Sequence, residues 1–223
     1  MKLLNKVIGI ILRDFYISLR NFSEVLTSLM FFFLSIFVFI FSIGPNNEIL
    51  QLTGVGILWS LLLLSSTLSL KKYYQMDFDN DSIIIIHMSG LSYEFLSFLK
   101  IISHFIFVYI PFLISIPLAC ILINLDTEKI YSLLISFFIG SLILSCIGSI
   151  SSAMNLLNKR NFTLGSIIVM LFSIPVVIFS VGIVNSSNNF TALLNILLGI
   201  LFIFMAITPW VSGMCIKLAL ENK

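Results

Sequence analysis

A chain of 223 residues, of which 59% are hydrophobic and 10% are charged, has a mean hydropathy of +1.14. Soluble domains carry about a quarter charged residues, and so few charges would leave large apolar patches on a surface facing water. These values exclude an ordinary soluble domain. A net charge of +2 with no long basic run gives no support for binding of nucleic acid.

The length limits what else the chain contains. A spanning helix needs roughly 20 mainly apolar residues, because the hydrocarbon core of a bilayer is about 30 Å thick. Six spans and their connections use nearly the whole chain, so we expect a single all-α membrane domain over residues 1–223. Any ATP hydrolysis that drives the protein is then expected in a separate subunit.

Residues 1–20 are too charged to span a membrane. Lys6, Arg13 and Arg20 recur every seven residues and share one face of a helix, whereas apolar side chains fill the other face. This pattern predicts an amphipathic helix that lies in the interface of an anionic leaflet. The alternative is a cytosolic end of the first spanning helix. The charges also interrupt the apolar region that a cleavable signal peptide requires, so we expect none.

Six apolar segments follow in chain order. They cover roughly residues 24–43, 49–70, 101–123, 130–154, 163–184 and 192–216. With six spans, both termini and the connections at 71–100 and 155–161 share one side of the membrane. That side holds 11 of the 12 lysines and arginines, and the other side keeps only Lys129. Because these residues accumulate on the cytoplasmic side, both termini are predicted to be cytoplasmic.

Prolines and small residues shape the predicted spans. Pro111, Pro117 and Pro175 each remove a backbone donor inside a span, so we expect bent helices there. The fourth span carries Gly140, Gly148 and several serines, which allow a neighbouring helix to approach closely. That neighbour is either another helix of the same chain, which we favour, or a second subunit in a homodimer.

No catalytic motif is present. The chain lacks a P-loop, a G-x-S-x-G and an H-E-x-x-H pattern, and the predicted span centres carry no charged residue. Cys120, Cys146 and Cys215 are far apart in apolar stretches, which is typical of small buried hydrophobic residues. His104 is a candidate ligand for haem or a metal, although a lone histidine is more often a hydrogen-bonded structural residue. We therefore expect no enzymatic activity and no firmly bound cofactor.

The connection at residues 71–100 is the most informative one. Among the predicted cytoplasmic loops it alone has room for a short helix outside the membrane, and its acidic residues lie beside apolar ones. This composition suits the docking of a cytosolic partner. The alternative is a solvated loop followed by an early start of the third span. The docking candidates are Asp77, Phe78, Asp79, Asp81, Ser82 and Glu94.

Short strings occur along the chain in a specific order. They are SIGP at 42–45, GILW at 56–59, LLSS at 63–66, the acidic run at 77–82, and Lys100, His104, Pro111 and Pro117. Their order and spacing resemble the heme exporter protein B family, the CcmB membrane subunit of the cytochrome c maturation ABC complex. Two departures from the family pattern D-G-S-L-E matter, because Asp81 stands where the family usually has glycine and Ile84 where it usually has glutamate.

The resemblance implies a permease-like subunit in the cytoplasmic (inner) membrane of a bacterium. Its implied partners are a cytosolic ATP-binding subunit, haem-handling membrane subunits and a periplasmic haem chaperone, with haem as a handled or transported ligand. ATP hydrolysis would move the 71–100 segment, and the scarcity of iron ligands in the spans favours transmission of work over a dedicated haem site.

Other functions stay open beside the one that the resemblance implies. One is a permease of another ABC exporter with a lipid-like or drug-like substrate. Another is a membrane scaffold of a haem-handling complex that transports nothing itself. A polytopic membrane enzyme has the least support, because the span centres carry no charged residue.

Overall fold

The computed structural model describes residues 2–20, 22–44, 46–70, 73–157, 163–186 and 189–223, and nearly all of them are helical. Six helical segments are long and apolar enough to cross a membrane. They are α2 (Phe22–Ile43), α3 (Asn47–Leu70), the continuous helix α6–η1–α7 (Tyr93–Ile123), α8 (Thr127–Leu157), α9 (Thr163–Asn185) and α10 (Phe190–Glu221). The prediction of an all-α protein with six spans is confirmed, and the chain is a multi-pass membrane protein.

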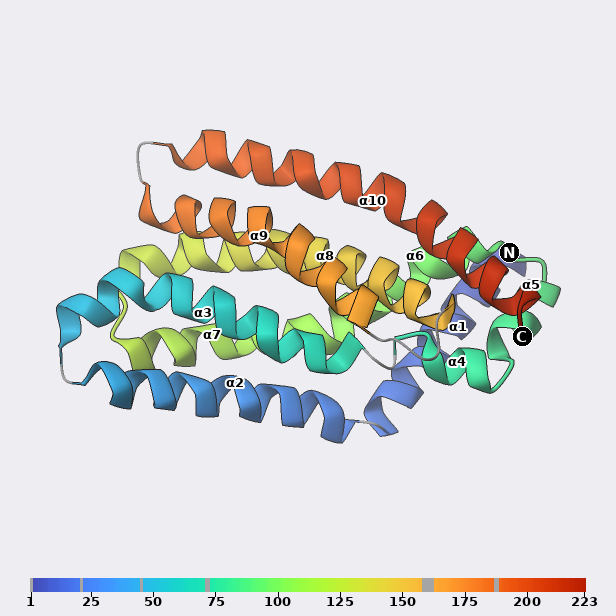
Figure 1. Cartoon of the computed structure of the whole chain (residues 1–223), viewed down its shortest axis with the longest axis horizontal. Coiled ribbons are helices and arrows are strands. Elements are labelled where there is room, and N and C mark those ends of the chain that lie inside the picture. Colours follow the sequence, from blue (N-terminus) through green and yellow to red (C-terminus); the bar gives the residue numbers. More distant parts are fainter. Residues whose placement is uncertain (1, 21, 45, 71–72, 158–162, 187–188) are drawn as a thin grey trace.

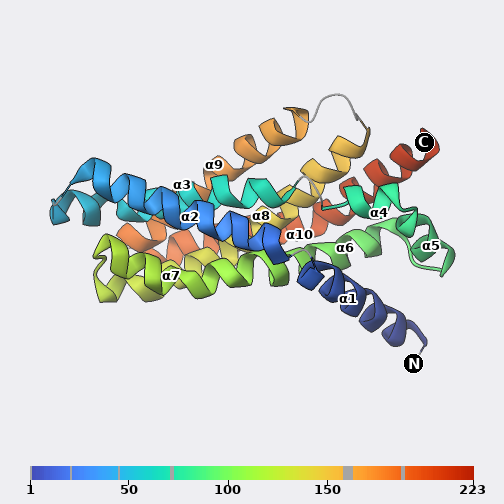
Figure 2. The ribbon, with the colours of Figure 1, turned by 90° about the horizontal axis from the view of Figure 1, so that it is seen from below.

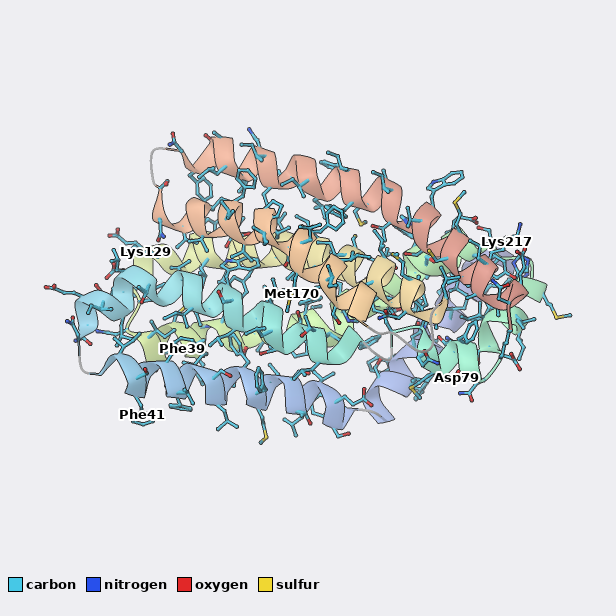
Figure 3. All side chains as sticks on the ribbon, viewed as in Figure 1. Phe39, Phe41, Asp79, Lys129, Met170 and Lys217 are labelled. Carbon is cyan, nitrogen blue, oxygen red and sulfur yellow. The ribbon has the colours of Figure 1, made fainter. Side chains whose placement is uncertain are left out.

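The spans lie side by side along one long axis (Figure 1). Both termini lie at the same end of this bundle, together with α1 (Lys2–Arg20), α4 (Gln75–Asp79) and α5 (Ser82–Met88). We call this the basic end. Figure 3 shows Asp79 and Lys217 at the basic end and Lys129 at the opposite end. This arrangement is the one expected from an even number of spans, although residues 158–161 of the fourth connection lie outside the described residues.

Helix α8 is the centre of the bundle, because it packs extensively on both α9 and α10. Gly140 of α8 lies directly against the Trp59 ring of α3, whose centroid is 4.4 Å from that of Phe137. Ser149 of α8 lies 3.0 Å from Ser212 of α10, measured between the two hydroxyl oxygens. The small residues of the fourth span therefore meet helices of the same chain, as favoured above, and the homodimer stays a prediction.

The outer helices expose apolar side chains along most of their length. Helices α2 and α10 form opposite edges of the bundle in Figure 1, and the most apolar stretch of α10 has the smallest share of buried residues among the described spans. Phe41 of α2 points away from the bundle in Figure 3 and is 82% exposed. Contact of such a surface with the hydrocarbon of a bilayer is favourable, whereas its exposure to water is unfavourable.

The third span begins earlier than the sequence indicated. Its helix starts at Tyr93 and not near residue 101, because Ser92 caps the helix. The Ser92 hydroxyl accepts a hydrogen bond from the Phe95 N–H, with a donor–acceptor distance of 3.2 Å. Residues 93–100 therefore belong to the helix of the third span, which is the early start that the sequence left open as an alternative.

The same helix changes its hydrogen-bonding pattern halfway along. A π-helical segment, η1 (Phe105–Tyr109), ends two residues before Pro111, and α7 (Ile110–Ile123) continues the helix. Helices bend both at π-helical turns and at prolines. Pro117 lies inside α7 and Pro175 inside α9, as predicted from the sequence, and Pro209 inside α10 is a further position of this kind. The bends themselves stay predictions.

Helix α1 is separate from α2 and leaves the bundle obliquely, as Figure 2 shows. The separate helix that the sequence predicted is therefore observed, and a straight extension of the first span is not. Its apolar side chains Ile8, Leu12 and Tyr16 are exposed, whereas Ile10 and Asp14 are buried. An exposed apolar face is what a position in the membrane interface requires.

Candidate functional site

The connection between the second and third spans folds into two short helices. We call them, with the turn between them, the α4–α5 segment (residues 75–88). Asp81 in this turn has a φ of +56°, which is in the left-handed region of backbone conformation. Residues with a Cβ atom are disfavoured in that region and glycine is not. Position 81 therefore favours glycine, the residue that the resemblance implied there, although this chain carries aspartate.

A buried set of charges joins α4 to α1 and α6. Arg13 Nη2 of α1 lies 2.8 Å from Asp14 Oδ1 and 3.0 Å from Asp77 Oδ2 of α4. Lys100 Nζ of α6 lies 3.2 Å from Asp14 Oδ2 and also pairs with Asp77. We call these four residues the ion cluster. Its two cations and two carboxylates balance, and they hold together three helices that are far apart in the sequence.

The ion cluster is largely removed from solvent. The exposed fractions of its side chains are 4% for Asp14, 9% for Asp77, 12% for Lys100 and 30% for Arg13. Burial acts to lower the pKa of Arg13, but the carboxylates of Asp77 and Asp14 outweigh this effect and the pKa is raised. Removing one partner of a buried ion pair leaves an uncompensated charge and costs about 3–5 kcal/mol. The ion cluster is therefore a strong constraint on the position of α4.

Two further lysines hold the α4–α5 segment from outside. Lys6 Nζ of α1 donates a hydrogen bond to the carbonyl of Ser89, just beyond α5. Lys223 Nζ donates to the carbonyl of Phe78 at 2.9 Å and lies 5.0 Å from the centre of the Phe78 ring. The same ammonium pairs with the Asp81 carboxylate. These contacts tie both α1 and the end of α10 to the segment.

The cationic face of α1 differs in its contacts from the prediction. Lys6 and Arg13 were expected to meet anionic lipid, but both bind protein groups of the α4–α5 segment and its neighbours. The reason is that α4 and the turn after α5 present a carboxylate and a carbonyl on the side that α1 approaches. The side chain of Arg20 lies outside those that the structure describes.

Tyr74 connects the start of α4 to the centre of the bundle. Its hydroxyl oxygen lies 2.7 Å from Ser149 Oγ of α8, and its N–H donates to Ser152 Oγ at 3.3 Å. Ser149 in turn meets Ser212 of α10. Burial raises the pKa of Tyr74 to about 12, so its phenol stays protonated and able to donate. A chain of hydrogen bonds therefore runs from the α4–α5 segment through α8 to α10.

His104 is held by protein groups on two sides. Its Nδ1 lies 3.1 Å from Ser145 Oγ, and the Ser145 hydroxyl donates to the carbonyl of Ile101 at 3.0 Å. The ring of Tyr73 lies over the imidazole, with 4.4 Å between the centroids.

A cavity of about 130 Å³ lies beside His104. The arrangement favours a structural role, and ligation of haem or a metal by His104 stays a prediction. Among the side chains that the structure describes, no group of three or more His, Cys, Asp or Glu is placed to hold a metal ion.

The α4–α5 segment exposes apolar side chains at the basic end of the bundle. Ile85 is 66% exposed and Met88 is 81% exposed, and Ile84 is exposed beside them. Asp79 on the preceding helix is also exposed. Exposed apolar residues outside the spans are suited to contact with a partner, and docking of a partner here stays a prediction. We call Asp79, Ile84, Ile85 and Met88 the docking surface.

The structure separates the predicted docking residues into two groups. Asp77 and Phe78 are buried, one in the ion cluster and the other beneath Lys223. They hold the segment in place, and direct docking by either one requires the segment to open. That role stays a prediction. The others lie at the surface or close to it: Asp79 and Asp81 are exposed, and Ser82 and Glu94 are half-buried at the first turns of α5 and α6.

The sequence did not reveal the ion cluster. A charge buried among apolar residues needs a partner, and both Asp14 and Lys100 have apolar neighbours in the sequence. This pattern indicates that each of the two side chains needs an oppositely charged partner. It does not indicate which residue that partner is, because Asp14 and Lys100 are 86 positions apart in the sequence.

Comparison with known proteins agrees with this architecture. The CcmB protein family matches residues 5–219 of the chain. Heme exporter protein B of Haemophilus influenzae is 29% identical over 159 residues, which cover 71% of this chain and 72% of that protein. The proteins of the same name from Rhodobacter capsulatus and Pseudomonas aeruginosa are 28% and 27% identical, over 66% and 70% of this chain and 68% and 70% of their own lengths. This chain therefore belongs to the CcmB protein family.

Proposed function

We propose that this chain is the membrane subunit of a haem export complex that serves the biogenesis of c-type cytochromes. Membership of the CcmB family and the name of its relatives, heme exporter protein B, support haem as the handled ligand. The proposed complex lies in the bacterial inner membrane with the basic end in the cytoplasm, because lysine and arginine accumulate on that side. Its other members are a cytosolic ATP-binding subunit, haem-handling membrane subunits and a periplasmic haem chaperone.

The main support for this proposal is the position and the surface of the α4–α5 segment. It lies outside the spans, and the ion cluster, Lys6 and Lys223 hold it in one position. At the same time it exposes Ile85 and Met88 as well as Asp79. A rigid element with an apolar and acidic surface suits a partner that must transmit force as well as bind. The ATP-binding subunit is the partner that a membrane subunit without its own P-loop requires.

The contacts of the segment give two routes for transmitting movement. Through Asp77 and Lys100 the segment is tied to the third span. Through Tyr74 and Ser149 it is tied to α8 and α10. A displacement of the segment on ATP hydrolysis would therefore move three of the spans together. In this mechanism the chain transmits work and performs no covalent chemistry, and the work releases haem-loaded chaperone or moves haem.

The first experiment tests docking. A tagged chain is purified from its own membranes in mild detergent, and the recovery of an ATP-binding subunit is compared between the wild type and the double variant Ile85→Glu, Met88→Glu. A buried unpaired carboxylate costs several kcal/mol, so we expect recovery to fall by roughly tenfold or more. The matched control is Leu218→Glu, an exposed apolar residue of α10 near the basic end.

The identity of the recovered partners separates the alternatives. An ATP-binding subunit together with haem-handling proteins supports the proposal. An ATP-binding subunit without them indicates a permease for another substrate. If no ATP-binding subunit is recovered with the wild type, the driven mechanism is wrong and the scaffold hypothesis is preferred.

A further inference from the structure

A small cavity lies where α1 meets the start of the first span. Its volume is about 130 Å³, and residues of α1, α2, α6 and η1 line most of it, with Tyr73, Met76 and Asp77 from the second connection. One part of the lining is polar and includes Asp14, Lys100 and Ser103. Another part is apolar and includes Val25, Phe107 and Val108. The cavity is thus amphipathic, and one wall of it is the ion cluster.

Two polar atoms in this lining lack a hydrogen bond within the part of the chain that the structure describes. Ser103 is only 4% exposed, and its buried Oγ atom has no hydrogen-bond partner among the described residues. Asp14 Oδ2 is also without a hydrogen bond of good geometry, although Lys100 Nζ lies 3.2 Å away. Buried polar groups in native proteins are normally satisfied. These two atoms therefore point to a ligand that supplies hydrogen-bond donors.

The charge of the lining selects the ligand further. Three carboxylates line the cavity, those of Asp14, Glu24 and Asp77, against one ammonium, that of Lys100, so the lining is net negative and favours a cation over an anion. A primary ammonium group is compact and has three donors, so it can donate to more than one acceptor of the lining. A trimethylammonium group has no N–H and cannot do so. The cavity is therefore suited to a primary amine.

The position of the cavity indicates which kind of molecule supplies that amine. The first span begins at Phe22, and the exposed apolar side chains of Phe22 and Leu26 follow along α2. Phe15 of the exposed α1 face lies 5.5 Å from Phe107 in the cavity wall, between ring centroids. A group at this level lies at the depth of phospholipid headgroups, with hydrocarbon next to the apolar wall.

We propose that this cavity binds a phospholipid whose headgroup carries a primary amine, of the phosphatidylethanolamine class. The ammonium group enters toward Asp14 and Ser103, and the acyl chains lie along the exposed apolar residues of α2. The proposal rests on the membrane location of the chain and does not depend on the docking of an ATP-binding subunit.

The test measures lipid retention directly. The full chain is reconstituted in nanodiscs of phosphatidylcholine that contain a small fraction of phosphatidylethanolamine or, separately, of phosphatidylglycerol, and lipids retained after transfer to detergent are counted by native mass spectrometry. We expect one retained phosphatidylethanolamine per chain, and no specific retention of the other two lipids. Ser103→Ala is expected to reduce this retention roughly tenfold, the effect of losing one hydrogen bond to a charged group. Ser103→Leu, which fills the cavity, is expected to abolish it.

The matched control is Ser115→Ala on the same transmembrane helix, whose hydroxyl bonds to the carbonyl of Phe112 and does not line the cavity. This variant should retain phosphatidylethanolamine as the wild type does. Equal retention of phosphatidylethanolamine and phosphatidylcholine, or retention that Ser103→Leu leaves unchanged, would overturn the proposal. Retention of no lipid by the wild type would also overturn it and would indicate a water-filled cavity. Because the readout is lipid mass, none of these results bears on the proposed export function.

Discussion

Lys100 Nζ on α6 lies 3.2 Å from Asp14 on α1, and the same ammonium pairs with Asp77 on α4. A single side chain of the third span thus fixes both the amphipathic N-terminal helix and the first helix of the α4–α5 segment. The three elements form one body at the basic end of the bundle. Force applied to the α4–α5 segment therefore reaches the third span and α1 together.

Replacing Lys100 by methionine is expected to destabilise the protein. The change leaves two buried carboxylates with only Arg13 as a partner, and loss of one member of a buried pair costs about 3–5 kcal/mol. The measurement is thermal unfolding in detergent. The control is Lys129→Met, because Lys129 pairs with Asp126 at 3.3 Å on an exposed surface, where such pairs contribute about 0–1 kcal/mol. Equal loss of stability in the two variants would show that the ion cluster is not a constraint.

Replacing Gly140 by alanine is expected to disturb the centre of the bundle. A Cβ atom at this position would overlap the Trp59 ring, which is fully buried between α3 and α8. Overpacking of this kind costs about 1–3 kcal/mol. Tryptophan fluorescence during thermal unfolding checks this, since Trp59 is one of the two tryptophans in the chain. Gly199→Ala is the control, because a Cβ atom there meets nothing within 4 Å. Unchanged stability and fluorescence in Gly140→Ala would contradict the packing described here.

Replacing Asp81 tests the left-handed turn of the α4–α5 segment. Asp81→Ala keeps the Cβ atom in an unfavourable conformation and loses the pair with Lys223, so the segment should open more often. Asp81→Gly loses the same pair but relieves about 1–2 kcal/mol of backbone strain, so it should resemble the wild type. Limited proteolysis of the segment in detergent distinguishes them, with cleavage expected to be several times faster in the alanine variant. Asp79→Ala, on the adjacent helix α4, is the control, and equal cleavage of the alanine and glycine variants at position 81 would refute this account.

Replacing Tyr74 by phenylalanine tests the hydrogen-bonded route from the segment to α8 and α10. The change removes the hydroxyl that lies 2.7 Å from Ser149 and is expected to cost about 1–2 kcal/mol of stability. In the proposed complex it should weaken stimulation of the ATP-binding subunit, while that subunit still co-purifies. Tyr131→Phe is the control, since Tyr131 is well exposed at the start of α8. Full stimulation in Tyr74→Phe would show that movement does not pass through this contact.

Much of the architecture was predictable because it depends on local properties of the chain. Six apolar segments of spanning length are visible in the sequence, and the asymmetry of the basic residues predicts that both termini lie at one end. The structure confirms the six spans and the shared end. The expected start of the third span near residue 101 was wrong, because Ser92 caps the helix and Tyr93 begins it, and the early start left open as the alternative is what the structure has.

The contacts of the candidate site depend on which helices meet, and only the tertiary structure decided them. The acidic run at 77–82 indicates a docking element, but nothing local shows that Asp77 is buried against Arg13 and Lys100 while Asp79 faces outward. The sequence by itself determined that the chain spans a membrane six times and carries an acidic connection. The tertiary structure decided which of its charges are paired, because such pairing follows from how helices cross in space and not from their separation along the chain.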